Sequence, residues 1–322
     1  MTTTWDERKG IFVGKQAKTG GKRRWASIRK NAVLYGLLLI PVVYILVFKY
    51  YPMYGALIAF QDYSIAKGFA GSPWVGLKHF RMFVQNYMFL RVLRNTVVIS
   101  LYSLATFPIP VMLAVLIHTM PLKKFTKSVQ LITYAPHFIS TVVMCGMILQ
   151  FLALRGGMVN NILNWFGLES VDFLGDAGKF AGVFVFSGVW QSAGYSSIIY
   201  ISALSGVDGE LHEAATVDGA SLLRRIWHID LPSILPTIVV MFVLRCGSIL
   251  SVGYEKVLLL QNSLNISASE VISTYVYKQG LASAIPQFSY STAVGLFVSV
   301  INMMMLVTVN QISKAITGSS LW

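Results

Sequence analysis

The chain contains six predominantly apolar stretches, each about 20 residues or more. This is the length that a helix needs to cross about 30 Å of hydrocarbon. A bilayer interior offers no hydrogen-bond partner to an exposed peptide group, so a spanning segment must satisfy its own backbone. The sequence therefore predicts an all-α membrane protein with about six transmembrane helices. They occupy approximately residues 31–51, 93–118, 129–152, 180–204, 233–254 and 291–312.

The composition supports a membrane protein rather than a soluble one. Of the 322 residues, 55% are hydrophobic and only 12% are charged, and the mean hydropathy is +0.63. Soluble domains carry about 25% charged residues. The formal charge of +13 lies mostly outside the apolar stretches. We expect a basic cytoplasmic tail at residues 1–30 and a transmembrane domain over residues 31–318.

The charge of the loops alternates along the chain. The tail, the C-terminal end and loops 119–128 and 205–232 carry a net charge of about +8, whereas loops 52–92, 153–179 and 255–290 carry about +2. Cytoplasmic loops are enriched in Lys and Arg. The pattern predicts a multi-pass protein of the cell (inner) membrane with both termini in the cytoplasm. It also accounts for the basic pI, so we expect contact with membrane lipid and no nucleic-acid partner.

Motifs of enzymatic chemistry are absent from the sequence. It has no G-x-x-x-x-G-K-[ST] phosphate loop, no H-E-x-x-H metal pair and no G-x-S-x-G nucleophile motif. Cys145 and Cys246 fall within predicted spans, where packing is the expected role rather than a disulfide or a metal site. We therefore expect no catalytic residue, no metal ligand and no bound cofactor in this chain.

The connection at residues 205–232 is polar and has the pattern of two short helices. Asp208 can cap the first helix, and Glu210 and Glu213 suit its first turn because the helix dipole favours negative charge there. Gly219 readily adopts the backbone conformation that ends a helix. The pattern predicts a helix, a glycine turn and a second helix.

The second helix is expected at about residues 220–230, with Leu231-Pro232 ending it and Pro236 beginning the fifth span. The loop charges place both helices at the cytoplasmic surface of the membrane. Pattern alone leaves two interpretations open. The segment is either a connector that packs against its own bundle or a surface that engages another protein.

The same residues resemble the "EAA" loop of inner-membrane permease subunits of ABC importers. In that family E-A-A is followed after three residues by G, after nine more by I, and after one more by L-P. This sequence matches at every one of those positions. The matching residues and those beside the glycine are Glu213, Ala214, Ala215, Asp218, Gly219, Ala220, Ile229, Leu231 and Pro232.

Other segments extend the resemblance to about residues 30–315. Residues 74–84 and 93–100 are similar to the segment that leads into the second span of carbohydrate-importing permeases. Residues 253–281 and 290–314 resemble the branch that imports polysaccharides and complex oligosaccharides. The external loops are short, which excludes the large insertion of some maltose-type permeases.

The resemblance implies a type I ABC importer permease fold with a cytoplasmic coupling helix, and import of a carbohydrate. It implies three kinds of partner: a second, similar permease subunit that forms a heterodimer, two ATPase subunits that use ATP and Mg²⁺, and an extracytoplasmic solute-binding protein. Glu213 is then the position expected to pair with a basic group of the ATPase, and Ala214 and Ala215 permit close packing. One departure is Gly209, where many relatives have proline. We call residues 205–232 the coupling segment.

Few residues are candidates for the substrate path. Arg245 lies in the fifth predicted span, where a charge is costly unless it faces a cavity or a partner. It either binds an acidic sugar, such as an alginate oligosaccharide, or is a structural charge held by carbonyl groups or the second subunit. Polar and aromatic side chains of the spans suit sugar recognition, although Tyr and Trp are also ordinary interface anchors. These are Trp190, Gln191, Tyr195 and Asn302.

Two other functions fit a polytopic protein. An ion-coupled secondary transporter or channel that works without an ATPase needs ionisable groups inside its spans. The predicted spans contain Arg245 but almost no acidic residue. A non-transporting scaffold would use the basic tail to bind anionic lipid. We prefer the importer permease because the EAA resemblance indicates it specifically.

Overall fold

The computed structural model of the protein describes residues 3–6, 11–14 and 31–322. The chain divides into two compact units, Met1–Leu57 and Ile58–Trp322. The first unit contains two short antiparallel strands, β1 (Thr3–Asp6) and β2 (Ile11–Gly14). The rest of the predicted basic tail lies outside the described residues.

A long apolar helix makes up the described remainder of the first unit. It consists of α2 (Ala32–Ile45), the π-helical turn η1 (Leu46–Tyr50) and α3 (Tyr51–Met53). The 3₁₀ helix η2 (Tyr54–Phe60) continues it into the second unit. Together they are 29 residues, long and apolar enough to cross a membrane. The first predicted span is thus helical.

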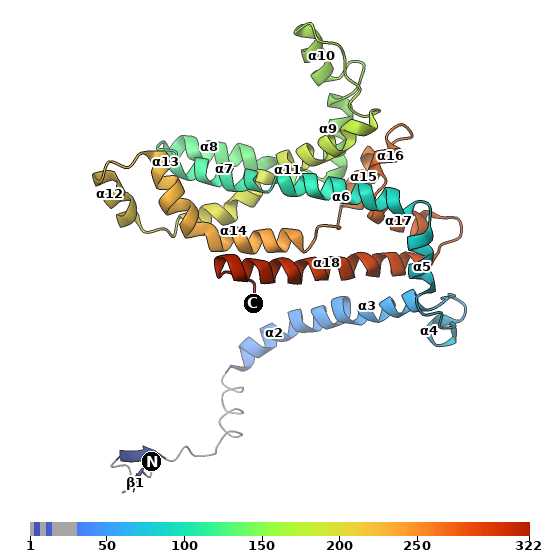
Figure 1. Ribbon diagram of the computed structural model, residues 1–322, viewed down its shortest axis with the longest axis horizontal. Helices are drawn as coiled ribbons and strands as arrows, with labels where there is room; N and C mark the ends of the chain where they lie inside the picture. Colours follow the sequence, from blue (N-terminus) through green and yellow to red (C-terminus); the bar gives the residue numbers. More distant parts are fainter. Residues whose placement is uncertain (1–2, 7–10, 15–30) are drawn as a thin grey trace. The chain divides into compact units, whose positions relative to one another are not determined.

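The second unit is a helical bundle with several short connecting helices (Figure 1). Apart from the strand pair in the first unit and an isolated bridge between Gln61 and Trp74, regular structure in the described residues is helical. The helical segments are α4 (Gly68–Gly71), α5 (Lys78–Gln85), α6 (Phe89–Ala105), α7 (Pro108–Thr119), α8 (Lys123–Tyr134), η3 (Ala135–Phe138), α9 (Thr141–Phe151), α10 (Met158–Trp165), η4 (Ala177–Lys179), α11 (Phe180–Leu204), α12 (Gly209–Val217), α13 (Leu222–Arg225), η5 (Ile226–Asp230), α14 (Leu231–Cys246), α15 (Tyr254–Leu260), α16 (Ile266–Ser269), α17 (Ile272–Tyr277), η6 (Lys278–Ala282) and α18 (Phe288–Thr317).

Three stretches of the second unit are long and apolar enough to cross a membrane: Phe89–Thr119, Leu222–Cys246 and Phe288–Thr317. They correspond to the second, fifth and sixth predicted spans. The first of them contains both α6 and α7, because Pro108 lacks an N–H donor and begins a new helix at its first position.

The third predicted span, residues 129–152, is not one straight helix. Ile139 and Ser140 are extended, and the helical parts before and after them meet at 101°. Pro136 lies in the 3₁₀ turn that precedes the break, and the Ser140 hydroxyl caps α9 by accepting a hydrogen bond from the Val143 N–H at 3.3 Å. The predicted span is therefore helical but broken, and an apolar run alone does not reveal such a bend.

The helix α11 occupies the fourth predicted span and lies at the centre of the second unit. It packs against α6, α7, α8 and α14. It is 25 residues long but does not reach the hydropathy of the other spans. Small residues allow close helix approach in membranes. At Gly194, a Cβ atom would lie only 2.1 Å from the carbonyl oxygen of Thr133 in α8.

The two buried cysteines belong to the packed interior. Cys145 of α9 joins an apolar cluster with Ile99, Phe180 and Val257. Cys246, at the end of α14, is also buried, and neither cysteine forms a disulfide. The predicted packing role of both residues is confirmed.

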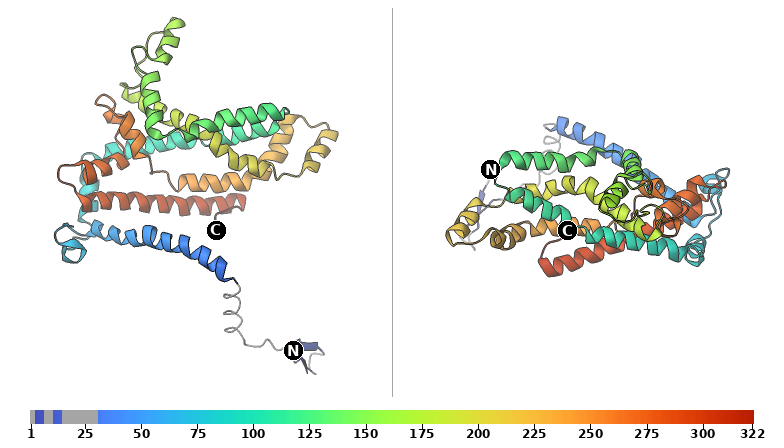
Figure 2. Two further views of the ribbon diagram at one scale, coloured as in Figure 1. Left: turned by 180° about the vertical axis from the view of Figure 1, so that it is seen from behind. Right: turned by 90° about the horizontal axis from the view of Figure 1, so that it is seen from above.

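Loops that the charge pattern assigns to the same side lie at the same end of the bundle. Figures 1 and 2 show the α7–α8 turn and the α12–α13 segment at one end of the bundle, whereas α5, α16 and α17 lie at the opposite end. Buried polar groups of α6 hold the loop at that opposite end. The Asn95 amide donates to the carbonyls of Ser267 and Glu270, each at 2.9 Å, and the Thr96 hydroxyl accepts from the Ile272 N–H at 2.9 Å.

Replacing Gly194 by alanine tests the α8–α11 contact. The added methyl group would collide with the backbone at Thr133, so Gly194→Ala is expected to lower the melting temperature of the purified protein by at least about 2 °C. Gly182→Ala is the matched control, since nothing lies within 4 Å of the new atom. Alanine is otherwise favoured over glycine in a helix by about 1 kcal/mol. Equal melting temperatures for the two variants would contradict the close contact.

Candidate functional site

The first helix of the coupling segment, α12, begins at a side-chain cap. The Asp208 carboxylate accepts a hydrogen bond from the Glu210 N–H at 3.0 Å. Glu210 lies in the first turn, where the helix dipole favours its charge. The predicted start of the helix is therefore confirmed, and the cap defines it although Gly209 replaces the proline of many relatives.

The C-terminal end of α12 is closed by a glycine turn. The Ala220 N–H bonds to the Ala215 carbonyl at 2.8 Å, and the Gly219 N–H bonds to the Thr216 carbonyl at 3.1 Å. This pair of bonds is the Schellman motif, which requires a left-handed residue. Gly219 supplies it with a φ of 72°. The predicted glycine turn is thus confirmed.

The second helix does not end where the pattern predicted. The segments α13, η5 and α14 run without a break from Leu222 to Cys246, through Pro232 and Pro236. A proline inside a helix lacks an N–H donor, and its ring crowds the carbonyl four residues earlier. The π-helical turn η5 directly precedes Leu231-Pro232 and widens the backbone there. The predicted stop was therefore wrong, and the coupling segment is continuous with the fifth span.

Two side-chain contacts join α12 to this continuous helix. The Nε2 atom of His212 lies 3.1 Å from Oδ1 of Asp230, whose side chain is almost completely buried. The Arg225 guanidinium donates a hydrogen bond to the Thr216 hydroxyl at 2.9 Å. α12 has no buried residue of its own, so these two contacts link it to the continuous helix, and the His212–Asp230 contact is a close approach without a hydrogen bond. Sequence analysis missed these four residues, since the acid directly before Leu231-Pro232 was their only local signal.

The outer surface of the coupling segment is apolar and open. Glu213 and Ala214 are exposed, and Glu213 forms no ion pair with any other described residue. Contiguous exposed apolar residues mark interaction surfaces. This favours a surface that engages another protein over a connector that packs against its own bundle. The exposed large apolar side chains are those of Leu211, Val217, Leu222, Leu223 and Trp227.

The other residues that match the EAA loop also lie on the helices and the turn of the coupling segment. Ala214 and Ala215 lie on α12, Asp218 and Ala220 flank the glycine turn, Ile229 lies in η5, and Leu231 and Pro232 begin α14. One compact unit thus contains all the residues that the EAA resemblance singled out.

A cavity of about 380 Å³ lies among α6, α7, α11, α14 and α15. Arg245 lines it from α14, Gln191 from α11 and Lys256 from α15. A second cavity of about 190 Å³ shares Ser103 and Arg245 with the first. Arg245 is therefore a cavity-lining residue, as one of the two sequence interpretations required.

Both cations of the larger cavity are held by neutral groups. The Arg245 guanidinium donates to the Ser103 hydroxyl. The Lys256 ammonium donates to the Phe184 carbonyl at 2.7 Å and lies 4.6 Å from the centroid of the Phe184 ring. Sequence analysis missed Lys256, because this residue follows the fifth predicted span in the chain. Only the tertiary fold brings it into contact with α11.

The remaining substrate-path candidates lie elsewhere or have structural contacts. The Gln191 amide donates to the Ile139 carbonyl at 2.9 Å beside the bend before α9. The Asn302 amide accepts from the Leu250 N–H at 3.0 Å and donates to the Ser251 hydroxyl at 2.9 Å, which ties α18 to the loop after α14. Trp190 and Tyr195 do not line the cavity. The Tyr195 ring stacks on His137 with centroids 3.8 Å apart.

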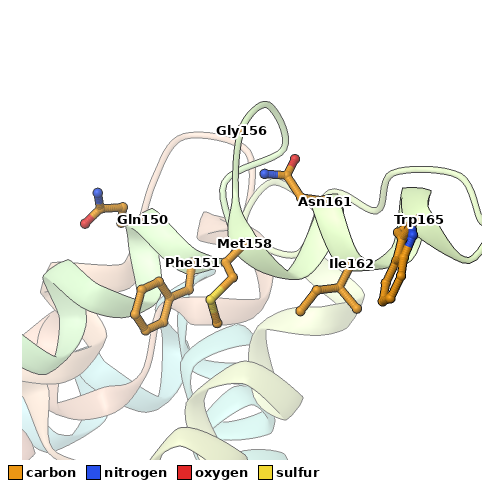
Figure 3. Close-up of a pocket in the computed structure, with 7 residues that line it drawn as sticks. All are labelled: Gln150, Phe151, Gly156, Met158, Asn161, Ile162 and Trp165. Atoms are coloured by element: carbon orange, nitrogen blue, oxygen red, sulfur yellow. The ribbon is translucent and has the colours of Figure 1, made fainter.

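A third hollow, of about 500 Å³, lies between the end of α9 and α10 (Figure 3). Phe151, Met158 and Ile162 point to the same side of it in the figure. No ionisable side chain lines it, and none of the predicted site residues does. It therefore lacks the charged groups that would recognise a charged ligand.

Comparison with known proteins identifies the family. Residues 82–318 match the family described as "binding-protein-dependent transport system inner membrane component". The polygalacturonan/rhamnogalacturonan transport system permease protein YteP of Bacillus subtilis (strain 168) is 41% identical over 295 residues, which cover 91% of each chain. Protein LplB of the same organism is 41% identical over 290 residues, which cover 90% of this chain and 91% of LplB.

Solved structures share the fold. One is the crystal structure of a bacterial ABC transporter involved in the import of the acidic polysaccharide alginate. It matches with a TM-score of 0.83 and 38% identity over 92% of this chain and 99% of that chain. A second structure is that of a bacterial alginate ABC transporter in complex with an alginate pentasaccharide-bound periplasmic protein. It matches with the same TM-score and identity and covers 93% of this chain and 100% of that chain. The chain therefore belongs to the inner-membrane components of binding-protein-dependent transport systems, as a multi-pass protein with the ABC importer permease fold.

Proposed function

We propose that this chain is the permease subunit through which an ATP-driven importer moves an acidic oligo- or polysaccharide into the cytoplasm. The family membership supports the import role. The similar proteins are named for polygalacturonan/rhamnogalacturonan and for alginate, and both kinds of polymer carry carboxylates. Arg245 in an internal cavity agrees with a substrate of this charge.

The division of labour within such an importer leaves this chain without a catalytic step. ATP and Mg²⁺ bind to two separate ATPase subunits, and a second, similar permease subunit completes the path. An extracytoplasmic solute-binding protein delivers the sugar. The solved complex with a periplasmic protein supports this last partner. Both termini of this chain then lie in the cytoplasm, on the side of the ATPase.

The observation that carries the proposal is the continuous helix from Leu222 to Cys246. Its first turns hold α12 through Arg225 and Asp230, and its last turn carries Arg245. A movement of the docked ATPase against α12 is thereby transmitted as a rigid-body movement to the wall of the cavity. A flexible connection would absorb the same movement without displacing the span.

An ion-coupled transporter is the weaker alternative. Two acidic residues that sequence analysis did not single out are buried, Asp230 and Glu270. Each has a basic neighbour: His212 at 3.1 Å from Asp230, and Lys278 at 3.3 Å from Glu270. Asp230 belongs to the coupling segment and Glu270 to the loop at the opposite end of the bundle. Neither acid lines either cavity that contains Arg245, so neither is placed for proton or sodium coupling along that path.

Substitutions in the coupling segment test the docking role. Glu213→Lys would turn an expected ion pair with the ATPase into a repulsion that costs roughly a few kcal/mol. Gly219→Val would place a β-branched residue at positive φ. Both variants are expected to insert and to bind the second permease subunit. Each is expected to lose the ATPase, or to hydrolyse ATP without uptake, in proteoliposomes that contain the binding protein and its ligand.

Glu210→Lys is the matched control, because Glu210 is also acidic and lies on α12, but is not one of the matched EAA positions. It is expected to retain most of the uptake. If Glu213→Lys and Gly219→Val retain full ligand-stimulated hydrolysis and uptake, the coupling segment does not dock the ATPase and the proposed function fails with it.

The contact between His212 and Asp230 is expected to be required for tight coupling. His212→Ala leaves Asp230 buried without its neighbour and frees α12, so fewer sugar molecules should be transported per ATP hydrolysed. Backbone amides of residues 209–217 should exchange hydrogen faster in this variant. Glu210→Gln is the control, because Glu210 lies on the same helix, is exposed and forms no ion pair among the described residues. Unchanged exchange in His212→Ala would show that the contact does not hold α12.

The membrane orientation has its own test. Reporter fusions at residues 120–126 and 210–225 are expected to give cytoplasmic signals. Fusions at residues 160–175 and 265–285 are expected to give external signals, since the loop charges place them outside. A cytoplasmic signal from residues 265–285 would overturn the proposed orientation.

A further inference from the structure

Arg245 and Lys256 line one cavity without a counter-charge. Each lies on a different helix, and both side chains reach the 380 Å³ space beside α11. None of the ion pairs among the described residues involves either cation. A charge within a membrane domain is costly unless an opposite charge or a polar partner compensates it. Two uncompensated cations in one cavity therefore create a site with a strong preference for an anion.

Each cation keeps donors free for a ligand. Lys256 has three N–H donors, of which the Phe184 carbonyl accepts one. Arg245 has five N–H donors, and its guanidinium donates to the Ser103 hydroxyl. The Phe184 ring supports the ammonium from one face without neutralising it. The fold thus positions both side chains and leaves several of their N–H donors available to a ligand.

A structural lysine of the same unit has different surroundings. Lys278 lies 3.3 Å from the Glu270 carboxylate and donates to the Gln261 amide oxygen at 2.7 Å. Its charge is neutralised within the chain, at the end of the bundle opposite the coupling segment. Lys256 has no such carboxylate. Lys278 therefore stabilises the loop through an ion pair, whereas the charge of Lys256 is available to an external anion.

We propose that Arg245 and Lys256 form a two-cation site that binds the carboxylates of the sugar units in transit. The proposal rests on the proposed function, and it names the groups that select an acidic over a neutral oligosaccharide. The cavity volume falls within the range of about 300–1,000 Å³ of ligand sites. Phe107 and Tyr200 line the same space and offer apolar surface for sugar rings, while Gln191 and Ser192 offer polar groups for hydroxyls.

The test uses the complete complex of permeases and ATPases in lipid nanodiscs, without the binding protein, so that the binding protein contributes no selectivity. The probes are a galacturonate trimer and the same trimer after reduction of its carboxyl groups. Their affinities are measured by calorimetry. The complete complex should bind the acidic trimer at least about tenfold more tightly, because hydrogen bonds between ionised groups are about twice as strong as those between neutral groups.

Lys256→Gln and Arg245→Gln should each weaken binding of the acidic trimer by about tenfold and binding of the neutral trimer by less than about twofold. Lys256→Arg retains the charge and should restore the preference. Lys278→Gln is the matched control, since it removes a lysine that is already paired, and it should leave the preference unchanged. Uptake of the acidic trimer by proteoliposomes with the binding protein should follow the same order.

Three results would overturn the proposal. Equal weakening of both trimers, or loss of the second permease subunit in Lys256→Gln, would make the cations structural. An unchanged preference in both glutamine variants would place the selectivity elsewhere, while the proposed function would still stand. Failure of the unmodified complex to import any oligosaccharide with ATP would instead refute the proposed function, because that outcome does not depend on the cations.

Discussion

Peptide groups in hydrocarbon must find their hydrogen-bond partners within the protein, and this constraint shapes every interruption of the helices. The break between α6 and α7 falls at Pro108, which has no N–H donor to lose. The bend before α9 leaves Ser140 to cap the new helix and Gln191 of α11 to donate to the Ile139 carbonyl. The central helix α11 thus satisfies groups that a bent span would otherwise leave open.

The elements determined by local chemistry were predictable from the sequence. The Asp208 cap and the turn at Gly219 depend on their own residue types. Apolar length predicted four of the six spans as helices that are long and apolar enough to cross a membrane, whereas the third is bent and α11 does not reach the same hydropathy. The continuation through Pro232 was missed, because a π-helical turn depends on backbone adjustments that have no sequence period. The pairing of His212 with Asp230 and the return of Lys256 to α11 were also missed. Both join residues that only the tertiary fold brings together.

The coupling segment and the cavity lie at the two ends of one helix. In the proposed importer, this arrangement would link ATP hydrolysis to sugar transport although the two take place at separate sites. In the proposed importer, nucleotide binding would change the position of the docked ATPase, and the helix would convert that change into a displacement of Arg245. A ligand shifts such an equilibrium only by its difference in affinity for the two states. A charged ligand held by Arg245 and Lys256 would supply a large difference, since the two cations belong to different helices that need not move together.

The π-helical turn η5 also affects the rotation, about the helix axis, of α12 relative to Arg245. Such a turn is equivalent to one extra residue inserted into an α-helix, and each residue of an α-helix advances the direction of its side chain by about 100°. Deletion of a single residue between Ile226 and Asp230 would keep the helix and its hydrophobicity, yet would turn the face of α12 by about a quarter of a circle relative to Arg245. The direction in which the surface of α12 faces therefore depends on chain length as well as on the side-chain contacts of α12, and a deletion here would rotate that surface without removing any of its residues.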